Sequence, residues 1–86
     1  MPDLDHPRTV EVIYYAILRE ITSVERELIQ TPLPTTRALY TFLADRYRFP
    51  LPPDSIQVAV NDEFVDLDHP LAAGDQIVFI PPVSGG

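Results

Sequence analysis

The stretch from residue 35 to residue 47, TTRALYTFLADRY, is the clearest helix in the chain, and the rest of the sequence is interpreted around it. Thr35 and Thr36 can each serve as its N-cap, since a threonine hydroxyl accepts a hydrogen bond from a free N–H of the first helical turn. Apolar side chains recur at helical spacing, and this pattern predicts one stripe that faces a sheet. The stripe comprises Leu39, Phe42, Leu43 and Arg46/Tyr47.

Two segments before this helix are predicted to be strands. Residues 9–16, TVEVIYYA, are rich in β-branched and aromatic side chains, which favour strands. Both faces of this strand carry apolar residues, which indicates cover on each side. One face holds Val10, Val12 and Tyr14, and the other holds Glu11, Ile13 and Tyr15. Residues 17–22 are expected to form a short helical turn, and residues 23–30 the second strand.

A hairpin and a last strand are predicted after the helix. Pro50 ends the helix, and residues 56–60 and 63–67 form the two arms of the hairpin. Asn61-Asp62 makes its turn, although the glycine of the usual Asn-Gly signal is absent. The turn that follows contains Gly74, which is available for a positive φ.

The last strand, residues 77–80, is apolar on both faces like the first, and Pro81 and Pro82 end it because they lack an N–H. A strand pair, a crossing helix, a hairpin and a final strand make a β-grasp arrangement of the α+β class. In this arrangement the first and last strands lie side by side at the sheet centre. The expected division is a flexible leader (1–8), a β-grasp domain (9–80) and an extended tail (81–86).

Composition limits the classes of partner and compartment. Thirteen acidic residues against six basic ones give a net charge of −7, which disfavours nucleic acid and favours a protein with a basic patch. The same balance also serves simply to keep a small domain soluble. The absence of cysteine fits a reducing compartment, and no apolar stretch is long enough for a membrane span or a signal peptide. We therefore expect a cytoplasmic protein with no membrane partner.

The usual signatures of a self-sufficient enzyme are missing from the sequence. His6 and His69 both stand in the tetrapeptide LDHP, beside proline, and are interpreted as turn residues rather than as metal ligands. Asp66 and Asp68 are interpreted as a solvated edge. The chain has no phosphate-binding glycine loop and no nucleophile elbow. We expect neither a metal site nor an enzyme that acts on its own.

The ending PPVSGG, residues 81–86, contains two of the three glycines in the chain. It could be a frayed end, or its terminal carboxylate could be the reactive group. Two glycines form a thin thread that passes through a narrow channel without Cβ clashes, and Pro81-Pro82 hold that thread extended. Because the glycines follow an apolar strand and a Pro-Pro stop, a working tail is favoured.

Residues 60–86, VNDEFVDLDHPLAAGDQIVFIPPVSGG, resemble the C-terminal third of the MoaD-like family, the small sulfur-carrying subunits of molybdopterin synthase. The shared pattern is Val-Asn, an apolar pair, DHPL, Gly-Asp, an apolar strand and PPV[ST]GG. Upstream, YYAILREI and PTTRAL resemble the first strand, its Arg-Glu turn and the helix start of that family. The resemblance covers about residues 9–86 and implies a ubiquitin-like β-grasp fold.

The resemblance also implies a reaction cycle and partners. An ATP-dependent, ubiquitin-activating-like adenylyltransferase would adenylate Gly86, and a sulfur donor protein would convert it to a thiocarboxylate. The tail would then enter the large synthase subunit and deliver sulfur to cyclic pyranopterin monophosphate, which forms the molybdopterin dithiolene. Two small subunits would flank a dimer of large subunits. ATP would be used by the activating enzyme, so no cofactor is expected to stay bound.

Particular residues take roles through this resemblance. The reactive site would be Gly86 with Gly85, and the residues that position the tail would be Pro81, Pro82, Val83 and Ser84. The interface with the large subunit would be Tyr15, Arg19, Phe64 and Ile80, although Phe64 could equally be a core residue. The sequence departs from the family in its leader, in lacking a glycine before the second strand, and in Tyr15 and Ile80, where phenylalanine is common.

Three alternatives to this function remain open at the level of sequence. The chain could be a sulfur carrier of the same fold that serves thiamine or cysteine synthesis. It could be a ubiquitin-like modifier joined to target lysines through Gly86. It could also be a β-grasp interaction module with an inert tail.

Overall fold

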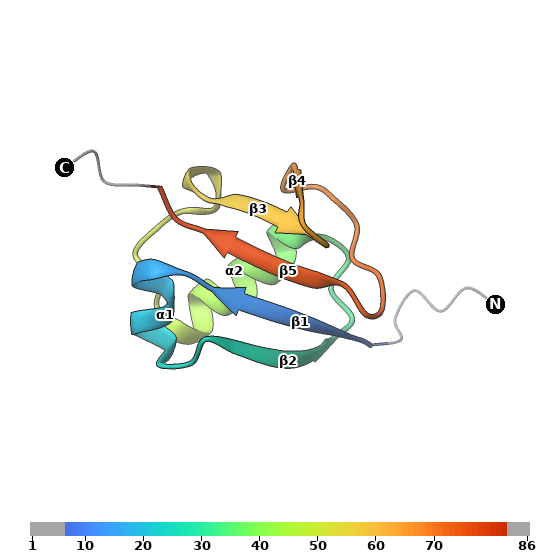
Figure 1. The fold of residues 1–86 in the computed structure, drawn as a ribbon, viewed down its shortest axis with the longest axis horizontal. Coiled ribbons are helices and arrows are strands. Elements are labelled where there is room, and N and C mark those ends of the chain that lie inside the picture. The colour runs from blue at the N-terminus through green and yellow to red at the C-terminus, as the bar shows by residue number, and fades with distance from the viewer. Residues whose placement is uncertain (1–6, 83–86) are drawn as a thin grey trace.

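A five-stranded mixed sheet organises residues 7–82, the part of the chain that the computed structural model describes (Figure 1). The strands lie in the order β2-β1-β5-β3-β4. The elements are β1 (Arg8–Tyr14), α1 (Ala16–Thr22), β2 (Arg26–Thr31), α2 (Thr36–Tyr47), the 3₁₀ helix η1 (Pro53–Ser55), β3 (Gln57–Val60), β4 (Glu63–Val65) and β5 (Gln76–Ile80).

The first and last strands are neighbours and run parallel, as the sequence predicted. Val12 of β1 pairs with Ile77 of β5, and Tyr14 pairs with Phe79. The other neighbours are antiparallel, so β2 and β4 form the two edges of the sheet. The remaining three strands each have a neighbour on both sides, and β5 is the central one. The chain therefore leaves the sheet from its middle. The α+β, β-grasp prediction is confirmed.

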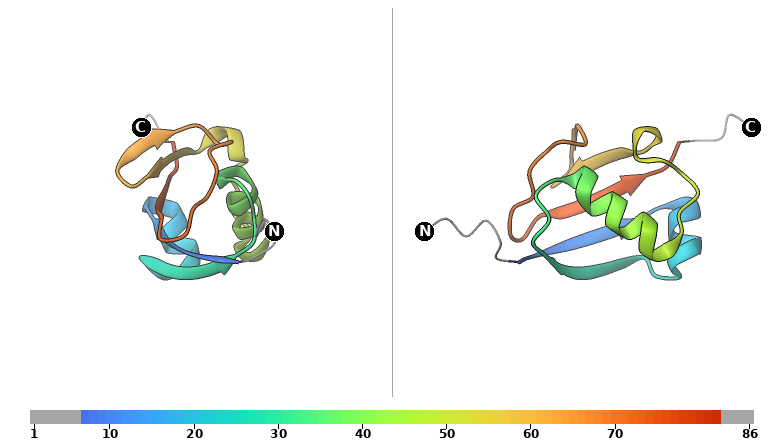
Figure 2. Two further views of the ribbon diagram at one scale, coloured as in Figure 1. Left: turned by 90° about the vertical axis from the view of Figure 1, so that its right-hand side faces the viewer. Right: turned by 180° about the vertical axis from the view of Figure 1, so that it is seen from behind.

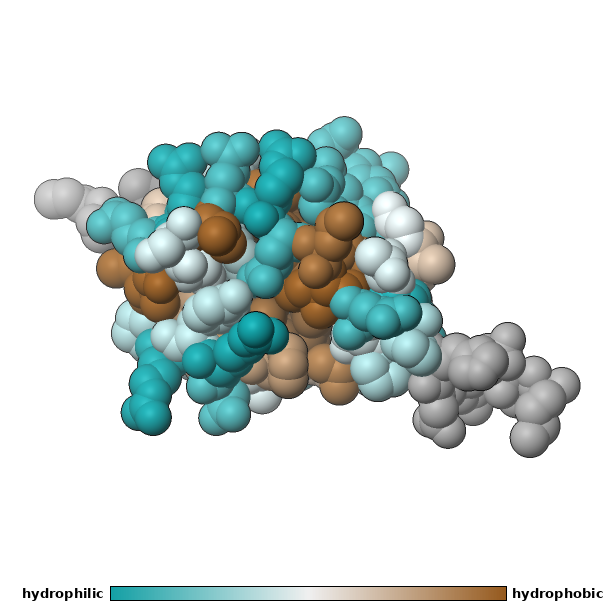
Figure 3. Space-filling model, turned by 90° about the horizontal axis from the view of Figure 1, so that it is seen from below, coloured by the Kyte–Doolittle hydropathy of each residue, from teal (hydrophilic) through white to brown (hydrophobic). Residues whose placement is uncertain are grey.

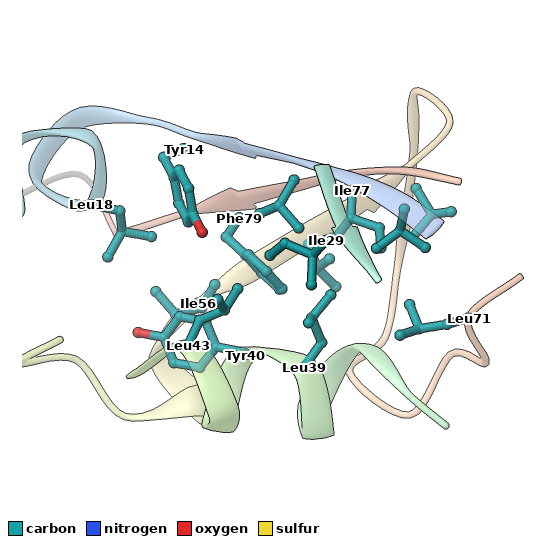
Figure 4. Packing of buried hydrophobic residues seen from close by; sticks show 14 of the residues in the cluster. Tyr14, Leu18, Ile29, Leu39, Tyr40, Leu43, Ile56, Leu71, Ile77 and Phe79 are labelled. Carbon is teal, nitrogen blue, oxygen red and sulfur yellow. The ribbon is translucent and has the colours of Figure 1, made fainter. Parts of the chain in front are cut away.

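Helix α2 covers one face of the sheet and leaves the other face open (Figure 2). The core lies between α2 and the covered face, where Tyr14, Ile77 and Phe79 point toward Leu39 and Leu43 of the helix (Figure 4). Burial of these apolar side chains supplies the main stabilising free energy of so small a domain. The predicted face of Val10, Val12 and Tyr14 is the one that enters this core.

The predicted helix stripe is right at Leu39 and Leu43 and wrong at Phe42. Phe42 is 45% exposed, whereas Tyr40 is fully buried, with its ring 5.2 Å from that of Phe79. A helix advances by about 100° per residue, which places Phe42 about a third of a turn from the centre of the buried stripe. The register of the sheet against α2 therefore selects Tyr40 as the larger core residue.

Three predicted strand ends also need correction. The second arm of the hairpin ends at Val65 rather than at residue 67. The first strand stops at Tyr14 rather than at residue 16, because α1 begins at Ala16 and Tyr15 becomes its N-cap residue. The second strand starts at Arg26 rather than at residue 23. Ser23 instead closes α1 in a left-handed conformation, with φ of 67° and its N–H on the carbonyl of Arg19 at 2.8 Å. Ser23 thus stands before the second strand in a left-handed conformation that glycine usually adopts at the end of a helix.

The start of α2 is tied to the loop that carries the DHPL sequence. Thr35 is the N-cap, and its hydroxyl accepts from the N–H of Ala38 at 3.2 Å, as the sequence allowed. The N–H of Thr36 donates to the carbonyl of His69 at 3.0 Å, and the N–H of Arg37 donates to that of Leu67 at 2.7 Å. The DHPL loop thus satisfies helix donors that would otherwise be free.

The Asn61-Asp62 turn confirms the hairpin, because both residues have positive φ, as a tight hairpin turn of the I′ type requires. The Asn61 side-chain amide donates to the buried Asp75 carboxylate at 2.9 Å, and Asp75 also accepts from the N–H of Ala72. Gly74 precedes it with φ of 85°, which confirms its predicted positive φ. These contacts set where β5 begins, and hence where it ends.

Candidate functional site

The open face of the sheet carries one row of side chains that crosses all five strands. The pairing places Arg26, Ile13, Val78, Ala59 and Phe64 next to one another in that order, from edge β2 to edge β4. Four of the five residues are apolar, although no helix covers this face. This explains why the first and last strands have apolar residues on both faces.

Phe64 ends this row on the edge strand β4 and is 71% exposed, so it does not belong to the core. Its backbone pairs with Ala59, which pairs in turn with Val78 of β5. A large exposed aromatic next to smaller apolar residues is typical of a protein contact surface. Phe64 therefore extends the apolar row to the edge of the sheet.

Tyr15 and Ile80 come together at the C-terminal ends of β1 and β5, around the root of the tail. Tyr15 is 52% exposed at the start of α1, and Ile80 is the last residue of β5. Pro81 is buried and Pro82 is exposed, so the described chain leaves the body of the protein at Pro82. Two of the predicted interface residues are thus placed beside the two prolines predicted to position the tail.

These four residues line a single apolar groove of about 650 Å³, which we call the tail-root groove. Its other lining residues are Ala16, Ile17 and Leu51. Leu51 lies 34 positions beyond Ile17 in the chain, and no local pattern pairs the two residues. Sequence reasoning missed both of them.

Arg19 lies outside the tail-root groove, in a neighbouring hollow of about 510 Å³ that shares Tyr15 and Ala16 with it. Arg19 contacts the carboxylate of Glu25 at 3.6 Å, and Arg26 contacts the same carboxylate at 3.4 Å. These pairs are exposed, so each contributes little to stability. They leave two guanidinium groups at the rim of the apolar surface, on a chain of net charge −7.

The structure does not bring all four predicted interface residues to one point. Tyr15, Ile80 and the nearby Arg19 cluster at the tail end, whereas Phe64 lies on the far side of β3 from β5. Leu28 on the opposite edge strand is as exposed as Phe64, at 72%, and was not predicted. The view onto the β2 edge shows hydrophobic surface set among hydrophilic residues (Figure 3).

Buried tyrosines support the site from the covered face. The hydroxyls of Tyr14 and Tyr47 both donate to one carboxylate oxygen of Glu27, which links β1, β2 and α2. Burial, followed by the bond to Glu27, raises the pKa of Tyr14 and of Tyr47. Tyr40 donates to the carbonyl of Leu51 at 2.8 Å, and burial raises the pKa of Tyr40 to about 12. The Tyr40 contact holds one wall of the tail-root groove.

Within residues 7–82 the structure contains no group of three or more histidine, cysteine, aspartate or glutamate side chains that could hold a metal ion. His69 lies in the loop before β5, and its carbonyl accepts a hydrogen bond from the N–H of Thr36 at the start of α2. Across the same residues no helix is long and apolar enough to cross a membrane. His6, Val83, Ser84, Gly85 and Gly86 fall outside the described residues, so their predicted roles remain predictions.

Comparison with known proteins gives consistent matches over almost the whole chain. A molybdopterin synthase sulfur carrier subunit from Escherichia coli (strain K12) is 35% identical over 80 residues, covering 90% of this chain and 99% of that protein. The protein of the same name from Homo sapiens is 40% identical over 83 residues, covering 90% of this chain and 93% of its own.

Solved structures share the fold. One is a complex of subunits 1 and 2 of molybdopterin-converting factor from Helicobacter pylori 26695, with 28% identity, a TM-score of 0.63, and coverage of 91% of this chain and 99% of that chain. Another is the small archaeal modifier protein SAMP1 from Haloferax volcanii, with 26% identity, a TM-score of 0.73 and the same coverage. The model of the ThiS family matches residues 12–86, and the relatives at 35% and 40% identity cover most of the chain. The chain therefore belongs to the ThiS family.

Proposed function

We propose that this protein is the sulfur-carrier subunit of a molybdopterin synthase. The observation that carries the proposal is the exit of the chain at Pro82, directly beside an exposed apolar groove and at the end of the central strand. Relatives with 35% and 40% identity are named as sulfur carrier subunits, and the Helicobacter pylori structure is a complex of two subunits. A rigid body with an apolar contact surface at the root of its tail suits delivery of a terminal group into a partner.

Activation would take place at the carboxylate of Gly86. A carboxylate oxygen attacks the α-phosphorus of ATP in the active site of an adenylyltransferase, and pyrophosphate leaves. A persulfide on a donor protein then attacks the carbonyl carbon and displaces AMP, which gives an acyl disulfide between Gly86 and the donor. A thiol cleaves the S–S bond of this adduct and is itself oxidised to a disulfide with the donor cysteine, and the product on Gly86 is a thiocarboxylate. The carboxylate needs this leaving group because it is a poor electrophile by itself.

Sulfur transfer would follow in the large subunit. The thiocarboxylate sulfur attacks a side-chain carbon of cyclic pyranopterin monophosphate, where a carbon–oxygen bond breaks and the oxygen leaves with its electron pair. Water then cleaves the bond between the new sulfur and the carbonyl carbon of Gly86. This hydrolysis returns the carboxylate of Gly86, so each of the two dithiolene sulfurs requires one carrier molecule in the thiocarboxylate form. Holding the sulfur on a short tether presents it in the right orientation and at high effective concentration.

The described residues have separate tasks in this proposal. Buried Pro81 fixes the root of the tail, and Pro82 restricts the direction in which the tail leaves. Tyr15, Ile80 and Phe64 supply apolar contact with the large subunit, and Arg19 supplies a charged rim. Gly85 and Gly86 would pass through a narrow channel of the large subunit, and Val83 and Ser84 would act as a spacer. Two such small subunits would bind a dimer of large subunits.

Intact-mass measurement tests the chemistry directly. The protein is incubated with its activating enzyme, ATP and a sulfur source, and one oxygen-for-sulfur exchange at Gly86 is expected. Deletion of Gly86 should abolish the exchange and leave thermal unfolding unchanged. Formation of molybdopterin by the deleted variant in a coupled assay with the large subunit would contradict the proposed mechanism.

A protein-modifier role is the second candidate, because SAMP1 shares the fold at 26% identity. The same mass experiment separates the two, since a modifier yields species of higher mass in which Gly86 is joined to another protein. Conjugates without the sulfur exchange would favour the modifier. Sulfur exchange without stimulation of molybdopterin formation would indicate a carrier for another pathway.

A further inference from the structure

We propose that the tail-root groove receives a short apolar segment of the large subunit, anchored by one bulky aliphatic or aromatic side chain. The proposal rests on the proposed function and adds two contact residues, Ile17 and Leu51, that neither the sequence nor the resemblance indicated. Ile17 forms part of the outer surface of α1, and Leu51 lies in the loop between α2 and η1.

The chemistry of the groove defines its occupant. Its side chains are apolar apart from the hydroxyl of Tyr15, and it contains no charged residue, although 22% of the chain is charged. Tyr15 and Ile17 leave 52% and 44% of their surfaces exposed there. Covering such a surface with another apolar group is favourable by roughly 25 cal/mol for each Å² removed from water. A charged or strongly polar occupant would lose hydration without gaining a partner.

The length of the tail limits how far from the groove a protein that takes the tail can lie. Four residues follow Pro82, and four residues span at most roughly 14 Å when fully extended. A protein that encloses the carboxylate of Gly86 must therefore approach within that distance of Pro82, which itself lines the groove. Since Pro81 is buried, this root is fixed to the body of the domain. The large subunit, which takes the tail in the proposed function, therefore lies close to the groove, and the activating enzyme, which must also reach Gly86, comes equally close.

The groove is also formed before any partner binds. The buried Tyr40 hydroxyl donates to the carbonyl of Leu51 at 2.8 Å, and Pro52 and Pro53 restrict the backbone that follows. A preformed pocket loses little conformational entropy on binding. The neighbouring hollow with Arg19 and Arg26 gives the apolar centre a polar rim, the usual arrangement at protein interfaces.

A matched pair of aspartate variants tests the proposal. Ile17→Asp and Phe42→Asp alter residues of equal exposure, 44% and 45%, but only Ile17 lines the groove, whereas Phe42 lies on α2. By titration calorimetry with the large subunit, we expect Ile17→Asp to raise Kd by about tenfold or more and Phe42→Asp to raise it by less than about twofold. Both should unfold at the temperature of the unmodified protein, since both residues are exposed.

Fluorescence gives a second measurement that does not depend on loss of binding. The chain has no cysteine, so Ile17→Cys and Phe42→Cys each accept one polarity-sensitive dye. On addition of the large subunit, the dye at position 17 should shift to the blue, because an apolar segment replaces water around it, and the dye at position 42 should not. Leu51→Ala, like Ile17→Asp, should raise the Kd for the large subunit.

The outcomes separate this proposal from the proposed function. If Ile17→Asp acquires the terminal sulfur normally but binds the large subunit weakly, the groove is the contact. If it acquires sulfur and binds as tightly as the unmodified protein, or if Phe42→Asp weakens binding equally, the groove proposal is overturned. If the unmodified protein neither acquires sulfur nor binds the large subunit, the proposed function fails instead.

Discussion

The two faces of the sheet differ in what covers them and therefore in what they determine. Phe79 of β5 points toward α2 and is fully buried, whereas Phe64 of β4 lies on the open face and is 71% exposed. The covered face holds most of the core and accounts for stability. On the open face Ile13 and Ala59 are already buried, so the exposed ring of Phe64 is the part of the apolar row that costs solvation in the free protein and that a partner would cover.

A second comparison, within the open face, concerns two equally exposed residues that have different neighbours. Leu28 and Phe64 stand on opposite edge strands and are equally exposed. Leu28 pairs with Glu11, which is level with Gln76 at the start of β5, while Phe64 is level with Val78, two residues before Ile80. Phe64 continues an apolar row nearer to the tail, and Leu28 lies beside charge. From this difference we expect Phe64, rather than Leu28, to contact the large subunit.

Truncation of the two phenylalanines should separate the faces by the largest margin. Phe79→Ala removes a buried ring and is expected to lower the free energy of unfolding by about 3–5 kcal/mol. Phe64→Ala should change it by less than about 0.5 kcal/mol, because the ring is exposed. Urea denaturation measures both. A loss above about 2 kcal/mol for Phe64→Ala would place that residue in the core after all.

Alkaline pH should weaken the covered face selectively. Burial raises the pKa of Tyr40 to about 12, and burial and Glu27 raise that of Tyr14, so folding favours their neutral hydroxyls. The neutral hydroxyls contribute fully to the free energy of unfolding below about pH 10, the pKa of tyrosine in an unfolded chain. This contribution is lost as the pH rises from there toward 12. We expect stability to fall by on the order of 1 kcal/mol by about pH 11.

Denaturation midpoints measured across this pH range test the assignment to tyrosine. Tyr40→Phe should be less stable than the unmodified protein at neutral pH, since it loses the bond to Leu51, but should show a shallower decline above about pH 10. The same decline in both proteins would exclude Tyr40 as a source.

Charge placed on the open face should distinguish its two edges. Phe64→Asp is expected to raise Kd for the large subunit by about tenfold, equivalent to about 1.4 kcal/mol, while Leu28→Asp should raise it by less than about threefold. Calorimetric titration of each variant gives the comparison, and thermal unfolding shows that both remain folded. Equal losses would mean that the interface spans the whole open face, as far as β2.

A glycine at the turn before β2 should produce the smallest effect, and it should be favourable. Ser23 has φ of 67°, a conformation that costs most residues roughly 1–2 kcal/mol but costs glycine nothing sterically. Because glycine loses more entropy on folding, Ser23→Gly should raise the free energy of unfolding by about 0.5–1 kcal/mol. Kd for the large subunit should not change. A destabilised variant would mean that the serine side chain has a role of its own.

Much of the fold could be predicted because it depends on local patterns. The alternation in residues 9–16 identified the core face of β1, Thr35 identified the start of α2, and Asn61-Asp62 identified the hairpin turn. Each feature depends on residues a few positions apart, and so it is visible in one short stretch of sequence. The ending PPVSGG predicts a working tail from an equally short stretch, and this stays a prediction because residues 83–86 lie outside the described part of the chain.

Other features were decided only by tertiary contacts. Tyr40 rather than Phe42 enters the core because the sheet sets which side of α2 is covered. Phe64 and Leu28 have equal exposure but different neighbours, which depends on strand order. Ile17 and Leu51 meet in the tail-root groove although 34 positions separate them. The sequence by itself determined most of the elements, because each depends on residues close together in the chain. The tertiary structure decided which surfaces surround the root of the tail, because these surfaces join side chains that no local periodicity relates.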